Sequence, residues 1–237
     1  MRNYFTLGGE DSRDYGVYIS GGGVFDSPNR AIDFISVPGR DGDIIGMETR
    51  LENGTLTYKD AFIYADFKNK LAAFRSMLLK TNAYRRLIDS YNPEEYRLAV
   101  YADGLSVRPT SNLDAGRFDI VFNVMPQRFL LSGDTPTTLT ATGSITNPTQ
   151  FPAKPLIRVY GNGVLGVGAD SITIINNAGN YIDIDCQSGI AYRDAANMNG
   201  SITLSGFDFP ALTSSANGIS LGAGISQVII TPRWWRV

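Results

Sequence analysis

The sequence feature that most restricts the fold is a strict two-residue alternation between Arg117 and Met125. Every second residue of this segment is large and apolar, namely Phe118, Ile120, Phe122 and Val124. Successive side chains of a β-strand point to opposite faces, so the alternation predicts a strand that buries one face. We expect Pro126 to end this strand, because proline has no N–H to donate to a sheet.

Shorter runs of the same kind recur along the chain, separated by Gly, Asn and Pro, which favour turns. They predict strands at residues 3–7, 15–19, 54–64, 84–90, 96–101, 155–160, 171–175, 181–185, 201–204, 218–221 and 226–231. The chain is therefore predicted to be mainly β. The adjacent acids Glu94 and Glu95 lie beside one of the turns, where we expect both carboxylates to be solvated.

Only one segment, from Asp66 to Lys80, has a convincing helical period. Its apolar residues fall on a single stripe, at Phe67, Leu71, Phe74 and Leu78. We expect Asp66 to cap the first turn and Lys80 to favour the last, because a helix dipole attracts a cation at its C-terminal end. The stripe predicts a helix that packs across a sheet.

The distribution of charge predicts two domains. Residues 1–132 hold 16 Lys and Arg and 17 Asp and Glu, whereas residues 133–237 hold only 5 and 6. The segment 133–153 is rich in Thr, Ser, Gly and Pro and is predicted to be a linker. The first domain, 1–132, then contains the helix, and the second, 154–237, contains only strands and turns, as in a β-sandwich.

Composition restricts the chemistry. The chain has no histidine and one cysteine, Cys186, so it cannot carry a Ser-His-Asp or Cys-His system or an intrachain disulfide, and we expect no zinc site. Gly21, Gly22 and Gly23 are followed by VFDSPNR, which is not helical, so a loop is favoured over a phosphate site. We expect no catalytic residue, no metal and no cofactor.

Net charge and hydropathy restrict the partners. The formal net charge is −2, which does not favour nucleic acid or a membrane surface as a ligand. No apolar run approaches the length of a membrane span, and no signal peptide follows the first residues. These features predict a protein made in a reducing cytoplasm.

Two groups of residues in the second half could still form a site. Asp183 and Asp185 are two apart on a predicted strand, so both carboxylates lie on one face, at a separation of about 7 Å that glycosidases also use. We favour a solvated polar face, with Ile182 and Ile184 in the core and Cys186 buried beside them. Near the end of the chain, Trp234 and Trp235 could stack on a sugar, but large aromatic residues are mostly buried, and closing a core is favoured.

The segment 29–51, NRAIDFISVPGRDGDIIGMETRL, is predicted to be a long hairpin. Each arm has about eight residues and would reach roughly 25 Å. Its turn holds Pro38, Gly39, Arg40, Asp41, Gly42 and Asp43. On these residues alone a solvated turn and a contact with a neighbouring subunit are equally supported.

Several stretches together resemble the distal tail protein (Dit) family of long-tailed, non-contractile bacteriophages. They are YGVYISGGGVFDSPNR, the VPGRDGD hairpin, the helix at 66–80, FDIVFNVMPQRFLLSG, NPTQFPAKPLIRVYGNG and the final PRWWR, and they follow one another in the family's order over nearly the whole chain. The resemblance implies an N-terminal domain that is a β-sandwich or split barrel, with one α-helix and a long hairpin. It also implies a galectin-like C-terminal β-sandwich.

The resemblance further implies a structural virion protein of the tail tip, assembled in the host bacterial cytoplasm. Six copies would form a ring through the N-terminal domains, as a single ring or as two stacked rings. The ring would connect the tail-tube protein to the tail-tip or lysin-type hub protein and leave a channel through which DNA only passes. The second domain is too short for a long arm, which weakens the expectation that it holds a receptor-binding protein. With the resemblance added, the hairpin turn is favoured as the inter-subunit contact.

Two other functions stay open. A carbohydrate-binding protein of the tail tip would act in adsorption to the host wall through the C-terminal domain, with Trp234, Trp235, Tyr181 and Tyr192 as the candidate aromatic residues. A glycosidase would use Asp183 and Asp185.

Overall fold

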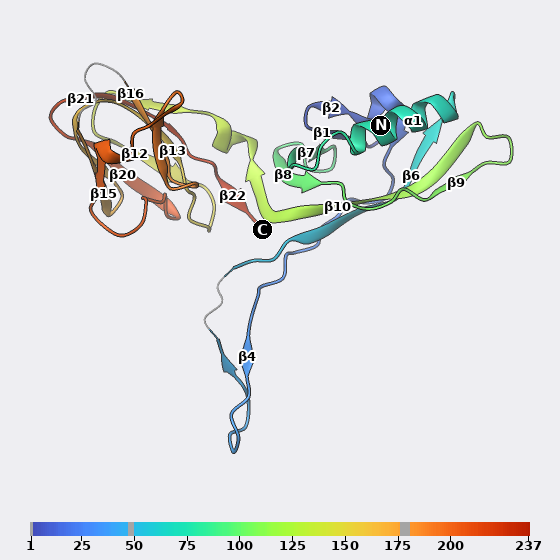
Figure 1. Ribbon diagram of the computed structural model, residues 1–237, viewed down its shortest axis with the longest axis horizontal. Helices are drawn as coiled ribbons and strands as arrows, with labels where there is room; N and C mark the ends of the chain where they lie inside the picture. The colour runs from blue at the N-terminus through green and yellow to red at the C-terminus, as the bar shows by residue number, and fades with distance from the viewer. Residues whose placement is uncertain (1, 47–49, 176–180) are drawn as a thin grey trace. The chain divides into compact units, whose positions relative to one another are not determined.

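The computed structural model describes residues 2–46, 50–175 and 181–237, and it contains two compact units (Figure 1). The first unit runs to Arg128 and also includes Val237, and the second comprises Phe129–Arg236. The division therefore precedes the predicted end of the first domain at residue 132. The predicted linker, 133–153, carries the strands β11 and β12, which pair within the second unit. This segment is part of a sheet, and not a linker.

The first unit is built on one antiparallel sheet with the strand order β2-β1-β7-β8-β10-β6-β3, and β9 also pairs with β10. The strands are β1 (Phe5–Leu7), β2 (Glu10–Asp11), β3 (Val17–Tyr18), β6 (Gly54–Tyr64), β7 (Arg85–Asp89), β8 (Glu95–Val100), β9 (Val107–Pro109) and β10 (Ala115–Leu130). A short 3-10 helix, Ser12–Tyr15, lies between β2 and β3. The prediction of a mainly β chain with one α-helix is confirmed.

The pair of β6 and β10 forms the centre of this sheet. All four residues of the predicted alternation in β10 are buried: Phe118, Ile120, Phe122 and Val124. The prediction that Pro126 ends the strand is wrong, because β10 continues to Leu130. The pairing with β6 already stops where Val124 faces Gly54, so position 126 needs no N–H on that side.

The helix α1 (Phe67–Leu78) covers one face of the sheet. Its predicted stripe is buried, together with Met77. The ring of Phe74 lies 6.4 Å from the ring of Phe5 and 5.8 Å from that of Phe118, so helix and sheet share one aromatic core. Asp66 precedes the helix in a left-handed conformation and makes no side-chain cap, contrary to the prediction. Its carboxylate accepts a hydrogen bond from the Asn69 side chain.

The predicted hairpin is present in the first unit (Figure 1). Its regular strands are short, β4 (Phe34–Ile35) and β5 (Ile44–Ile45), but backbone contacts extend the pairing. The N–H of Glu52 donates to the carbonyl of Asn29 at 2.9 Å, and the N–H of Gly46 donates to that of Asp33 at 2.7 Å. The two arms therefore run antiparallel from the sheet to the turn. Residues 47–49 of the predicted hairpin lie outside the described residues.

The second unit contains two sheets that share one apolar core, which makes it a β-sandwich. One sheet has the order β11-β21-β13-β16-β17-β18, and the other has the order β12-β20-β14-β15-β19. The strands are β11 (Thr137–Leu139), β12 (Gly143–Asn147), β13 (Leu156–Gly161), β14 (Gly163–Val167), β15 (Asp170–Ile174), β16 (Tyr181–Asp185), β17 (Ile190–Arg193), β18 (Ala196–Asn197), β19 (Ile202–Leu204), β20 (Ser215–Leu221) and β21 (Ile225–Thr231). The short strand β22 (Trp235–Arg236) belongs to neither sheet and pairs with β10. Two 3-10 helices, Leu131–Asp134 and Asn199–Ser201, complete it.

The core of the second unit confirms several assignments. Ile182 and Ile184 are fully buried, and Cys186 is buried next to them as a free thiol. Burial raises the pKa of the Cys186 thiol to about 12. In the part of the chain that the structure describes, no helix has the length and apolar character of a membrane span.

Candidate functional site: the exposed hairpin and its root

The hairpin is unusual because its paired strands are apolar on both sides. Phe34 pairs with Ile45 and projects from one face, and Ile35 pairs with Ile44 and projects from the other. All four side chains are exposed, with Phe34 at 61% and Ile45 at 64% of their full accessible surface. Ile32 in the first arm is exposed as well.

An isolated two-stranded ribbon with this surface is marginal in water, since it buries little apolar area on either face. Contiguous exposed apolar residues mark places where another surface binds. The hairpin also presents the outer edges of β4 and β5, which are templates for pairing with a further strand. The arrangement therefore suits an assembly contact.

The turn of the hairpin, which we call the tip, consists of Pro38, Gly39, Arg40, Asp41, Gly42 and Asp43, and all six residues are exposed. Gly39 and Gly42 both have φ near +79°, a conformation that glycine adopts without strain. The N–H of Arg40 donates to the carbonyl of Val37 at 3.2 Å and closes the turn. Among the described residues, no salt bridge engages the charged side chains of the tip, so they are available to a partner surface.

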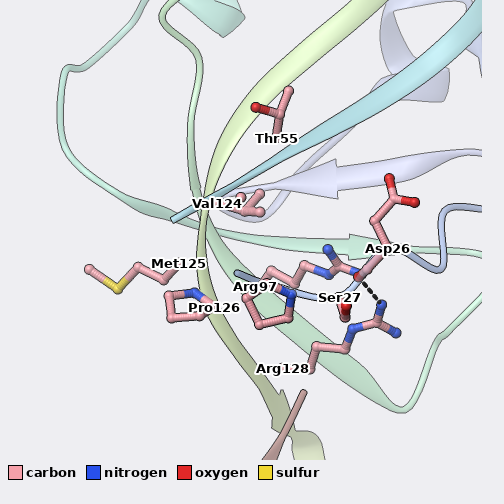
Figure 2. A pocket seen from close by; sticks show the side chains of 10 residues that line it. Asp26, Ser27, Thr55, Arg97, Val124, Met125, Pro126 and Arg128 are labelled. Carbon is pink, nitrogen blue, oxygen red and sulfur yellow. Dashed lines mark hydrogen bonds between the residues drawn. The ribbon is translucent and has the colours of Figure 1, made fainter. Parts of the chain in front are cut away.

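The root of the hairpin is fastened to the end of β10. One terminal nitrogen of Arg128 donates to the backbone carbonyl of Asp26 at 3.2 Å (Figure 2). The other lies 3.3 Å from the carboxylate of Glu95. Glu95 is almost completely buried, so the prediction of a solvated carboxylate is wrong for this residue.

A small pocket opens at this point, and we call it the root pocket (Figure 2). It is lined by Asp26, Ser27, Pro28, Gly54, Thr55, Arg97, Val124, Met125, Pro126 and Arg128. Burial lowers the pKa of the Arg97 guanidinium, and the nearby positive charge of Arg128 lowers it further. No sequence pattern pointed to this pocket, because Arg97 and Arg128 come together only through the neighbouring strands β8 and β10.

The comparisons with known proteins rest on structure alone. No protein-family model matches the chain, and no curated protein matches it. The crystal structure of the Dit protein (gp 19.1) of SPP1 superposes with a TM-score of 0.73 over 100% of this chain and 100% of that one, at 14% sequence identity. The chain has the fold of a phage distal tail protein.

A second match is a chain of the phage P2 baseplate in its activated conformation with calcium. It covers 97% of this chain and 98% of its own length, with a TM-score of 0.50 and 12% identity. The SPP1 protein is described as a paradigm of the hub adsorption apparatus in phages that infect Gram-positive bacteria. The distal tail fold suggested by the sequence motifs is thus confirmed over both units, at an identity too low to transfer any residue's role.

Within this distal tail fold, the two aspartates of β16 are both engaged. The carboxylate of Asp183 is buried and accepts two hydrogen bonds from the Arg158 guanidinium, at 2.7 and 2.8 Å. Asp185 is paired with Arg233 at 2.6 Å. Burial alone would raise the pKa of Asp185, but the hydrogen bonds and charge of Arg233 lower it below its usual value. The lowered pKa of Asp185 does not favour the protonated carboxyl group that a glycosidase acid requires.

The four aromatic residues considered for sugar binding do not form one stacking platform. Trp234 is buried in the core, as predicted. The ring of Trp235 stacks on Phe151 with centroids 4.5 Å apart. The hydroxyl of Tyr181 donates to Asp194 at 2.6 Å, and the guanidinium of Arg158 lies 4.0 Å from the Tyr181 ring centroid.

Tyr192 sits on β17, where its Cα faces that of Asp183. The triple glycine forms a loop, as predicted, and the Gly21 carbonyl accepts a hydrogen bond from Tyr91. Among the residues that the structure describes, no group of His, Cys, Asp and Glu is placed to hold a metal ion.

Proposed function

We propose that this protein is a structural hub of a phage tail, in which six copies close into a ring through their first units. The ring connects the tail tube to the tail tip and leaves a channel for DNA. The whole-chain fold match to SPP1 Dit supports the class of protein. The exposed apolar hairpin carries the argument for assembly, because a ribbon with apolar side chains on both faces needs a second surface.

The hairpin favours a ring over a two-fold dimer. A projecting element that fits a different surface of the next copy gives a head-to-tail contact, and such contacts form a ring where the rotation between copies closes. The tip adds specificity, since Arg40, Asp41 and Asp43 place charges of both signs on an exposed turn. We therefore propose the tip, Pro38 to Asp43, as part of the inter-subunit contact.

The proposed partners follow from this position in the tail. They are the tail-tube protein on one side and the tail-tip or lysin-type hub protein on the other. The location is the tail tip of the virion. A net charge of −2 suits a channel wall that DNA must pass without binding.

The test is negative-stain imaging of the purified protein together with its mass from light scattering. We expect a ring with a central hole and a mass of six chains, or twelve if two rings stack. A protein that stays monomeric at every concentration would overturn the proposal.

A matched pair of variants locates the contact. Replacing both Phe34 and Ile45 by serine removes apolar surface from one face of the hairpin, and we expect it to abolish the ring. The control is Leu79→Ser, which removes an equally exposed apolar side chain at the end of α1. If both variants assemble as the unaltered protein does, the hairpin is not the contact.

A further inference from the structure

The root pocket brings two guanidinium groups to one small opening. Arg97 and Arg128 both line it, and Figure 2 shows their side chains next to Asp26 and Ser27. Two like charges this close repel each other, and burial of Arg97 adds to that cost. We propose that the root pocket binds one oxyanion group, a carboxylate or a phosphate, between Arg97 and Arg128.

Arg97 is the donor that lacks an acceptor. Among the described residues, none accepts a hydrogen bond from its guanidinium, although the group presents five N–H donors. Its N–H groups are not sealed inside the protein, because the buried polar atoms without a partner in the described residues belong to Arg85 and Tyr101. Arg97 lines the root pocket, where a planar oxyanion can accept two of its N–H groups.

The charges of Glu95 and Asp89 raise the pKa of Arg97 and offset part of the cost of its burial, but both carboxylates have other partners. Asp26 also lines the pocket. The carboxylate of Glu95 is paired with Arg128, and that of Asp89 accepts from the Tyr58 hydroxyl at 2.8 Å and from two backbone N–H groups. Ser27 and Thr55 add hydroxyl groups to the pocket wall. The pocket thus offers the planar guanidinium of Arg97, the positive charge of Arg128 and two hydroxyl groups to a single small group.

An occupant would also tighten the hairpin root. Arg128 already holds the Asp26 carbonyl, and Asp26 to Pro28 form one wall of the pocket. An oxyanion bound to both arginines would link this wall to β8 and β10. Two sources have the required chemistry: a free anion in solution, or an acidic side chain of a second copy, such as Asp41 or Asp43 of its tip. The second source rests on the proposed ring.

The first experiment measures binding of inorganic phosphate from the rise in melting temperature, with sodium chloride of equal ionic strength as the reference. It is carried out on dilute, monomeric protein. Phosphate also stabilises proteins non-specifically, so the difference between variants is decisive. We expect Arg97→Met to weaken phosphate binding by about tenfold or more, since it removes a charge-assisted pair of hydrogen bonds.

The controls separate this loss from damage to the fold. Arg75→Met removes an exposed arginine from α1 and should leave the phosphate response unchanged. Arg97→Lys keeps the charge without the planar fork, and an intermediate affinity is expected. An equal phosphate response in unaltered protein, Arg97→Met and Arg97→Lys would overturn the proposal.

The second experiment identifies the source by asking whether phosphate dissociates the assembled protein. A fall in mass with phosphate, but not with chloride of equal ionic strength, supports a carboxylate of a second copy as the natural occupant. An unchanged mass, together with loss of phosphate binding in Arg97→Met, supports a free anion. If no ring forms, the first experiment still tests the pocket, so failure of the ring and failure of the site are told apart.

Discussion

The two antiparallel ribbons of the first unit, β6–β10 and β4–β5, differ in what covers their side chains. In β10 the residues Phe118, Ile120, Phe122 and Val124 form one apolar face, and this face belongs to the core that α1 covers. In β4–β5 both faces are apolar, and both are exposed. Alternation with one apolar face indicates a strand whose apolar side chains are buried within its own domain. A ribbon with two apolar faces indicates a strand pair whose burial requires another molecule.

The largest expected effect tests this contrast directly. Phe118→Ala should lower the free energy of unfolding by about 3–5 kcal/mol, because it leaves a cavity in the aromatic core. Phe34→Ala should change the stability of the monomer by less than about 0.5 kcal/mol, because the side chain is exposed. Urea denaturation of dilute protein measures both. If Phe34→Ala lowered the free energy of unfolding by several kcal/mol, the hairpin would pack on its own unit. The proposed difference between β4–β5 and β6–β10 would then be wrong.

A smaller effect is expected at the tip. Arg40→Glu should weaken assembly by about fivefold to tenfold per interface and leave the melting temperature of the monomer unchanged, because the tip touches only the neighbour in the proposed ring. Sedimentation velocity across a dilution series measures the change at moderate salt. Arg75→Glu on α1 makes the same charge change and serves as the control. Identical assembly of both variants would limit the contact to the apolar strands.

The smallest effect is expected at Asp185, whose charge is paired with that of Arg233. The pKa of Asp185 is lowered in the folded protein, so its pairing with Arg233 stabilises the fold above the unfolded value of about 3.9. That stabilisation is lost as the pH falls through the lower folded pKa. Asp185→Asn should remove about 1 kcal/mol at pH 7 and show a weaker loss of stability between pH 5 and 3. Chemical denaturation across this range checks it.

Asp208→Asn makes the same change of charge at an exposed carboxylate and serves as the control. A parallel profile in both variants would mean that the Asp185–Arg233 pair stabilises the second unit no more than a solvated charge does.

The sequence alone predicted the elements whose pattern is local. The alternation in β10 and the stripe of α1 each state which side chains are buried, and the structure agrees on every one of them. It failed at 133–153, where Thr, Ser and Gly suggested a linker. Threonine is also a good strand former, and Ile145 and Asn147 of β12 are buried there.

The candidate site was predictable only in part. The charged tip stood out because a turn rich in glycine separates two apolar arms. The pair Arg97 and Arg128 could not be predicted, because the local sequence around each residue does not indicate that β8 and β10 are neighbouring strands. Glu95 shows the same limit, since its burial depends on Arg128, which lies on another strand.

The buried thiol of Cys186 allows the opening of the second unit to be measured by chemical labelling. Cys186 is the chain's only cysteine, it is almost fully covered, and its pKa is raised to about 12. At neutral pH the Cys186 thiol is protonated and inaccessible to a thiol reagent until the sandwich opens. The rate of labelling therefore measures how often the sandwich opens. Both tryptophans, Trp234 and Trp235, lie in the same unit. Labelling and tryptophan fluorescence therefore report on the second unit, because the first unit contains neither cysteine nor tryptophan.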